Sequence, residues 1–128
     1  MDDWAEKAAA KLKEKGVKLT PQRLALLGVI GEIGPSHPTL TQLYIEVRKL
    51  QPTVSFSTLY NNVVKLARLG LLDLIQVGGE TRIEVNTKPH VNLLEGGKVV
   101  DVEDRELIEE ASKRLGRRIK YLFAVPGD

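Results

Sequence analysis

Residues 54–70 read Val54-Ser-Phe-Ser-Thr-Leu-Tyr-Asn-Asn-Val-Val-Lys-Leu-Ala-Arg-Leu-Gly70, and this stretch predicts an amphipathic helix. At 100° per residue, the apolar side chains fall on one side of the helix and the polar ones on the other. The apolar side contains Leu59, Val63, Leu66 and Ala67, and the polar side contains Ser57, Asn61, Lys65 and Arg68. We expect Ser55 or Ser57 to cap the first turn and Gly70 to end the helix in a left-handed conformation.

The outward face of this helix carries no Asp or Glu. Its amide, hydroxyl, phenol and cationic groups are the kinds that hydrogen-bond base edges and phosphate oxygens in DNA. Most amphipathic helices simply present such a face to water. The neighbouring segments decide between the two interpretations, and they favour a helix that reads DNA.

The segments on either side of residues 54–70 predict a winged helix-turn-helix. Upstream lies a helix that ends near Leu50, followed by a short connection containing Pro52. Downstream, residues 71–77 and 81–85 are expected to form two strands around the glycine turn at 78–80. Helix, turn, helix and β-hairpin in this order are typical of a winged helix.

Two further helices are expected before the helix-turn-helix. Residues 2–15 carry Trp4, Ala8 and Leu12 at four-residue spacing, which indicates a narrow apolar stripe. In the next helix, Thr20 is expected as N-cap and Pro21 as the first helical residue. After the turn at 34–38, Thr39 is expected to cap a helix with an inward face. The residues assigned to that inward face are Leu40, Leu43, Tyr44, Val47 and Leu50.

The second half of the chain predicts two strands, a helix and a strand, at 91–94, 98–102, 103–115 and 119–125. Such a layer is too small to stand alone, so we expect a second copy of the chain to cover it. The expected fold class is therefore α+β. A winged-helix DNA-binding domain at 1–86 precedes a small β-β-α-β dimerisation domain at 87–128.

Composition excludes several classes of protein. The sequence of 128 residues has no apolar run long enough for a membrane span and no signal-like start, so we expect a cytoplasmic protein that does not contact membranes. It also lacks cysteine, a Gly-rich phosphate loop and a His-Glu-x-x-His motif, and we do not expect an enzyme. Residues 1–70 hold ten Lys and Arg against six Asp and Glu, a modest basic surplus around the proposed reading helix.

Several runs of the sequence together resemble the ferric uptake regulator (Fur) family, and within it the peroxide-sensing repressors. These runs are Leu19-Thr-Pro-Gln-Arg23, His37-Pro-Thr, Leu43-Tyr44, residues 54–63 and Gly70-Leu71. The resemblance implies a homodimeric repressor that binds a palindromic operator in double-stranded DNA. It also implies that Tyr60 and Asn61 contact bases, Lys18 enters the minor groove and Arg23 binds phosphate. The complete set expected to bind DNA is Lys18, Arg23, Ser57, Thr58, Tyr60, Asn61 and Lys65.

The family resemblance also implies metal sites, and here the sequence departs from the family. A structural zinc held by two Cys-x-x-Cys pairs is excluded because the chain has no cysteine. For one regulatory divalent metal (Zn, Fe or Mn), the matching residues are His37, Glu84, His90 and Asp101. Asn92 stands where relatives carry a further histidine. A second alignment places Lys88 and His90 at that motif instead.

Two questions stay open on the sequence alone. His37 and His90 could be structural residues of a repressor that binds DNA without metal. The same winged helix could also serve as a protein-interaction module of the transcription machinery, with no specific DNA binding.

Overall fold

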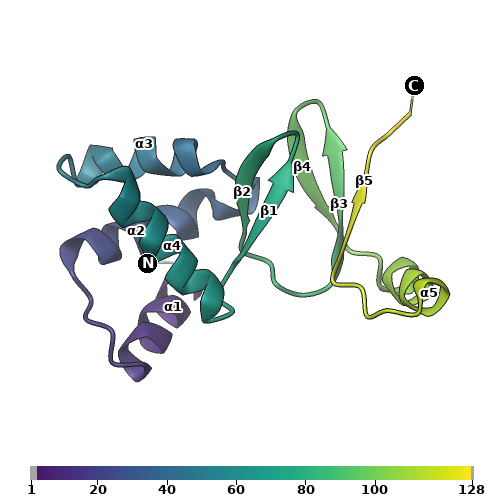
Figure 1. Ribbon diagram of the computed structural model, residues 1–128, viewed down its shortest axis with the longest axis horizontal. Helices are drawn as coiled ribbons and strands as arrows, with labels where there is room; N and C mark the ends of the chain where they lie inside the picture. The colour runs from purple at the N-terminus through teal and green to yellow at the C-terminus, as the bar shows by residue number, and fades with distance from the viewer. Residues whose placement is uncertain (1–2, 128) are drawn as a thin grey trace. The chain divides into compact units, whose positions relative to one another are not determined.

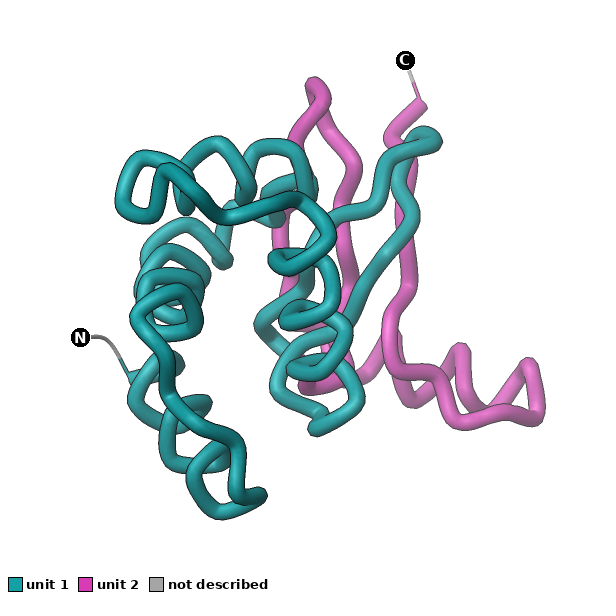
Figure 2. Tube along the Cα trace, turned by 60° about the vertical axis from the view of Figure 1, so that its left-hand side comes forward, with its two compact units in different colours: residues 1–86 teal, residues 87–128 magenta. Residues whose placement is uncertain are grey.

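The computed structural model describes residues 3–127 and separates the chain into two units, Met1–Asn86 (unit 1) and Thr87–Asp128 (unit 2) (Figure 2). Unit 1 contains helices followed by a β-hairpin (Figure 1). Their bounds are α1 (Asp3–Glu14), α2 (Pro21–Ile33), the 3-10 helix η1 (Gly34–Ser36), α3 (Leu40–Leu50), α4 (Phe56–Arg68), β1 (Asp73–Val77) and β2 (Glu80–Glu84). The predicted order of helix, turn, helix and wing is confirmed.

The helices of unit 1 begin where side-chain caps satisfy their first backbone N–H groups. Thr20 Oγ1 accepts from the Arg23 N–H at 3.2 Å, as predicted. Thr39 and Gln42 form a reciprocal capping box at the start of α3. At α4 the cap is Ser55, whose Oγ accepts from the Thr58 N–H at 3.1 Å. Sequence reasoning left Ser55 and Ser57 as alternatives, and this hydrogen bond decides between them.

The wing is a tight antiparallel hairpin. Asp73 pairs with Glu84 at one end of the β1–β2 ladder and Val77 pairs with Glu80 at the other. Gly78 and Gly79 both have positive φ (58° and 80°), the backbone required by a two-residue turn that matches strand twist. The first strand starts at residue 73 and not at 71 as predicted, because the Leu71 N–H donates to the Leu66 carbonyl and the Leu71 carbonyl accepts from Trp4 Nε1.

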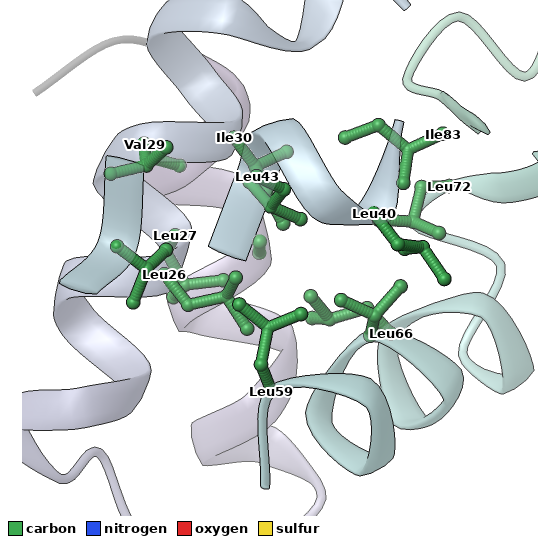
Figure 3. Packing of buried hydrophobic residues seen from close by; sticks show 14 of the residues in the cluster. Leu26, Leu27, Val29, Ile30, Leu40, Leu43, Leu59, Leu66, Leu72 and Ile83 are labelled. Carbon is green, nitrogen blue, oxygen red and sulfur yellow. The ribbon is translucent and has the colours of Figure 1, made fainter. Parts of the chain in front are cut away.

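One core holds the helices and the wing together. It contains side chains from α1 to α4, the residue before the wing and β2, and Figure 3 shows many of them meeting: Leu26, Leu27, Val29, Ile30, Leu40, Leu43, Leu59, Leu66, Leu72 and Ile83. Truncating a buried leucine of this kind to alanine costs about 2–5 kcal/mol. The prediction that Leu50 faces inward is wrong. Its side chain is 60% exposed, since it lies in the last turn of α3 and extends past the packed face.

Unit 2 is a three-stranded sheet with one helix. Its elements are β3 (His90–Glu95), β4 (Lys98–Val102), α5 (Arg105–Leu115) and β5 (Tyr121–Ala124). The strand order is β4-β3-β5, with β3 antiparallel to β4 and parallel to β5. Helix α5 provides the crossover that a parallel pair requires. It starts two residues later than predicted because Asp104 is its N-cap and accepts from the Leu107 N–H at 3.0 Å.

One face of the unit 2 sheet is apolar except at the hairpin end, where Glu95 pairs with Lys98. Cα partners on adjacent strands share a face, and the register aligns Val91 with Val102 and Leu122, and Leu93 with Val100 and Ala124. Val100 is 44% exposed on this face. The predicted α+β fold class, with a winged helix followed by a small β-β-α-β unit, is confirmed. None of the helices formed by residues 3–127 has the length and apolar character needed to cross a membrane.

Candidate nucleic-acid interface and metal-ligand residues

Helix α4 presents the polar face that the sequence predicts. Ser57, Asn61 and Lys65 are exposed, and Tyr60 is 42% exposed. Leu59, Val63 and Leu66 are buried on the opposite side. Because the inward face is fixed by the core, the orientation of the outward side chains is set by packing and not by contacts of their own. The helix therefore offers hydroxyl, phenol, amide and ammonium groups on one rigid surface.

Thr58 differs from the other residues of α4 predicted to bind DNA because it is partly buried and takes part in the helix cap. Its hydroxyl accepts from Ser55 Oγ at 2.9 Å, and its carbonyl accepts from Asn62 Nδ2 at 2.9 Å. These bonds hold the first turn of α4 in place. In that turn, the backbone N–H groups and the positive end of the helix dipole favour an anion such as a phosphate.

Phe56 is a surface residue that sequence reasoning missed. It opens α4, is 43% exposed, and its ring stacks on Tyr60 with centroids 6.5 Å apart and planes inclined by 20°. The Tyr44 ring meets the Phe56 ring edge-on at 5.5 Å, and the Tyr44 hydroxyl donates to the Val54 carbonyl at 3.1 Å. The sequence does contain a signal for this contact: positions 56 and 60 are four residues apart, and side chains at this spacing lie on one helix face. The Tyr60 ring therefore packs on Phe56, which in turn packs on Tyr44.

The two basic residues predicted at the start of α2 have different surroundings. Lys18 is exposed, whereas Arg23 is partly buried and bonded within unit 1. Arg23 Nε donates to Asn62 Oδ1 at 2.9 Å, and Nη1 donates to the Lys18 carbonyl at 2.8 Å. The guanidinium group is thus fixed in orientation before any ligand arrives. Its second terminal nitrogen, Nη2, takes part in neither of these bonds.

His37 lies in a strained and well-anchored turn of unit 1. It is the one non-glycine residue with positive φ (54°) among residues 3–127, and such strain often marks functional positions. Its Nε2 lies 2.9 Å from Glu84 Oε2, and both side chains are buried. Its carbonyl accepts from Arg82 Nη1 at 3.0 Å. This bond ties the Arg82 guanidinium of the wing to the turn.

The wing strand β2 is joined directly to the turn that carries His37. The Ile83 N–H donates to the Pro38 carbonyl at 3.1 Å, and Thr39 forms a β-bridge with Arg82. Thr39 is also the N-cap of α3. Two of the residues predicted to bind metal, His37 and Glu84, are therefore brought together by the same hydrogen bonds that connect the helix-turn-helix to its wing.

In unit 2, the structure brings together the other two residues predicted to bind metal. His90 Nε2 lies 3.3 Å from Asp101 Oδ1, and it lies 3.1 Å from the Asn92 side-chain oxygen. His90 Nδ1 lies 2.6 Å from the Lys88 carbonyl oxygen. His90 and Asn92 are buried, and Asp101 is partly exposed. Each unit thus holds one imidazole beside a carboxylate, a donor pair suited to Zn, Fe or Mn.

Comparisons with known proteins identify the family. The sequence model of the Ferric uptake regulator family matches residues 14–122. The chain is 51% identical over 119 residues to the ferric uptake regulation protein homolog of Archaeoglobus fulgidus, with 93% of each chain covered. It is 30% identical over 112 residues to the peroxide-responsive repressor PerR of Staphylococcus epidermidis, covering 85% of this chain and 74% of PerR.

A solved structure shows the same fold. The Helicobacter pylori ferric uptake regulator Fur superposes with a TM-score of 0.72 at 18% identity, covering 96% of this chain and 89% of that one. The absence of cysteine from the present sequence excludes a zinc site made of four cysteines. The family model spans most of the chain and the Archaeoglobus fulgidus relative matches this chain over 93% of its length, so this protein belongs to the ferric uptake regulator family.

Proposed function

We propose that this protein is a sequence-specific, metal-responsive DNA-binding transcriptional repressor that acts as a homodimer. The observation that carries the proposal is the outward face of α4, which is exposed, rigidly mounted and free of acidic side chains. Membership of a family whose relatives include the repressor PerR supports the same conclusion.

Helix α4 would lie in the major groove and read bases directly. The Asn61 amide matches the N6 and N7 edge of an adenine, and the Tyr60 ring matches a thymine methyl group. Ser57, Thr58 and Lys65 would bind the backbone around these bases, as would Arg23 through Nη2. Lys18 would enter the neighbouring minor groove. These contacts combine base reading with the phosphate neutralisation that supplies much of the affinity.

The surfaces of unit 2 support a homodimer. Strand β5 is an edge strand, the sheet has a largely apolar face, and Leu107 and Leu115 of α5 are exposed. Within the described part of unit 2, the buried apolar side chains are only Val91, Val99 and Ile108. A second copy of the chain would cover the apolar side chains of unit 2 that remain exposed. Two copies related by a two-fold axis would present two α4 helices to a palindromic operator.

One divalent metal would be the effector of the repressor. We propose that His37 and Glu84 of unit 1 and His90 and Asp101 of unit 2 are its ligands, as the family resemblance implies. The donor chemistry fits, because each pair combines an imidazole nitrogen with a carboxylate oxygen. A metal acts as an effector when it binds the DNA-binding conformation more tightly than the alternative.

The test is a DNA-binding titration with and without metal. Duplexes from the region upstream of the protein's own gene are titrated by fluorescence anisotropy after EDTA treatment, and again with Mn(II) or Zn(II) restored. We expect tight binding only with metal, with an affinity that falls steeply between about 50 and 200 mM salt. Asn61→Ala should weaken operator binding by about 1–3 kcal/mol while leaving binding to scrambled DNA nearly unchanged.

Matched variants make the titration specific. Lys65→Ala and Lys113→Ala remove the same charge, but only Lys65 lies on the outward face of α4. The proposed interface is supported if Lys65→Ala loses DNA affinity and the control variant does not. Equal binding with and without metal contradicts the effector role and leaves a constitutive repressor. No binding at low salt overturns the repressor and favours the protein-interaction module.

A further inference from the structure

The aromatic contacts at the start of α4 continue back into α3. The Tyr60 ring stacks on Phe56, and the Phe56 ring meets the Tyr44 ring of α3 edge-on. At the far end of this row, the Arg48 guanidinium carbon lies 5.6 Å from the centroid of the Tyr44 ring. The row therefore joins Tyr60, which is proposed to read bases, to a cation on the preceding helix (Figure 1).

Arg48 is an exposed residue in the last turn of α3. Among residues 3–127, no carboxylate forms an ion pair with it, and its contact with Tyr44 is of the cation–π kind. The neighbouring Lys49 differs, because its Nζ bonds to Glu46 Oε1 at 2.9 Å. Arg48 is therefore a cation that a ring orients and whose N–H groups can serve a further acceptor.

Helical geometry turns Arg48 and Lys49 toward different surroundings. Position 48 lies about 40° from position 44 around the α3 axis, and position 49 lies about 100° further round. Tyr44 faces α4, since its hydroxyl donates to the Val54 carbonyl and its ring contacts Phe56. Arg48 therefore lies on the flank of α3 that borders the reading helix, and Lys49 lies beyond that flank.

The charge of this part of the chain suits an anion. Residues 47–72 contain no Asp or Glu, so the acid-free surface of α4 continues into the last turn of α3. In a DNA duplex, backbone phosphates flank the base edges of the major groove, and a guanidinium can bind one phosphate through two parallel N–H bonds. Arg48 matches such a phosphate in charge, donor geometry and position.

We propose that Arg48 binds a DNA backbone phosphate next to the base pair read by Tyr60, so that the DNA interface of this protein extends from α4 onto the end of α3. The inference rests on the proposed function and adds a residue that the predicted DNA-binding set does not contain. In the competing arrangement, the contact with Tyr44 only stabilises the packing of α3 on α4, and the Arg48 charge faces water.

The experiment measures DNA binding of the full chain by fluorescence anisotropy with Mn(II) present. The duplex from the upstream region and a scrambled duplex are titrated between about 50 and 200 mM salt. We expect Arg48→Gln to weaken binding to both duplexes by the same factor, about tenfold at the lowest salt, because a phosphate contact carries no sequence information. The slope of log affinity against log salt should fall by about one.

Two further variants show whether the charge or its position matters. Arg48→Lys keeps the charge and should keep the salt slope, but it should bind less tightly because an ammonium lacks the paired N–H groups. Lys49→Gln is the matched control, since it removes the same charge one position along α3. It should keep the salt slope of the wild type.

Three results would overturn the inference. The first is an unchanged salt slope in Arg48→Gln, and the second is an equal loss of slope in Arg48→Gln and Lys49→Gln, which would indicate a general effect of net charge. The third is a loss of affinity in Arg48→Gln that urea unfolding traces to a less stable fold and that leaves the slope unchanged, because Arg48 would then act only through packing.

Asn61→Ala, measured in parallel, distinguishes failure of the inference from failure of the proposed function. If Asn61→Ala weakens binding to the upstream duplex but Arg48→Gln keeps the wild-type slope, the phosphate contact is refuted and the DNA-binding regulator stands. A chain that binds neither duplex at low salt refutes the proposed function and the phosphate contact together.

Discussion

Arg23 Nε donates a hydrogen bond to Asn62 Oδ1 over 2.9 Å, and this bond joins α2 to α4. Asn62 Nδ2 in turn donates to the Thr58 carbonyl in the preceding turn of α4. The position of the proposed reading helix therefore depends on two side chains behind its DNA-facing surface. Arg23 has a second role under the proposed function, because Nη2 would bind phosphate.

The two roles of Arg23 can be separated by substitution. Asn62→Ala removes the bond to α2 and should lower the free energy of unfolding by about 1 kcal/mol and weaken operator binding. It should leave the salt dependence unchanged, since no phosphate contact is lost. Arg23→Gln should weaken binding and also reduce the salt slope by about one. Urea unfolding and anisotropy at several salt concentrations measure both effects. A matching loss of slope in Asn62→Ala would contradict this division of roles.

The stacked rings of Phe56 and Tyr60 should contribute jointly to DNA binding. Phe56→Ala removes the ring on which Tyr60 rests and should weaken operator binding, with little effect on stability because Phe56 is 43% exposed. A double-mutant cycle of Phe56→Ala and Tyr60→Ala should give a coupling energy of about 0.5–1.5 kcal/mol. Strictly additive effects in the anisotropy titration would show that the stacking does not matter for binding.

The left-handed backbone of His37 predicts an unusual order of stability between two variants. Glycine adopts φ of 54° without cost, whereas alanine at such a position is disfavoured by about 1–2 kcal/mol. Both variants lose the imidazole beside Glu84. We therefore expect His37→Gly to be more stable than His37→Ala by about 1 kcal/mol in urea unfolding with EDTA present. Equal stability, or the reverse order, would mean that this turn relaxes to another conformation.

Dimer formation should depend on the apolar sheet face of unit 2. Val100→Asp places a charge on this face, where the wild-type side chain is 44% exposed, and should convert the dimer to a monomer because a buried charge without a partner is costly. Sedimentation equilibrium measures the change. Thr41→Asp adds the same charge to an exposed position of α3 and serves as the control. A dimeric Val100→Asp protein would place the interface elsewhere.

Metal addition should stabilise the folded protein by mass action. At about 100 times the dissociation constant, a metal that binds only the folded state adds about 2.7 kcal/mol to the free energy of unfolding. Glu84→Gln removes one proposed ligand charge and should abolish most of this gain. Thermal unfolding with EDTA and with Mn(II) provides the measurement. The matched control is Glu32→Gln, an exposed acidic residue of α2, which should keep the full gain.

The features predicted correctly from sequence are those set by local chemistry. Thr20 and Thr39 cap their helices because a hydroxyl next to a helix start finds backbone N–H groups within three residues. Gly70 takes φ of +75° at the end of α4, as a helix-ending glycine should. The sequence pattern of α4 is enough to predict the helix and its buried face, because its apolar residues recur with a period of 3.6 residues throughout.

The features that sequence reasoning missed depend on contacts distant in the chain or on backbone conformation. The bond between Arg23 and Asn62 spans 39 positions and leaves no local signal. The left-handed φ of His37 also leaves no signal in the sequence, because only a few per cent of non-glycine residues adopt such a conformation. Leu50 fits the helical period of the inward face, but the core ends before it. The family resemblance supplied His37, Glu84, His90 and Asp101 as candidates, and whether they bind one metal stays a prediction.

The hydrogen bond from Trp4 Nε1 to the Leu71 carbonyl, 2.9 Å long, fastens α1 to the segment between the end of α4 and the wing. Trp4 is the single tryptophan of the sequence. Indole emission responds to the polarity and hydrogen bonding of its surroundings, so the chain carries its own optical reporter beside the reading helix. Movement at that junction on addition of metal or operator can be followed by ultraviolet fluorescence of the unlabelled protein.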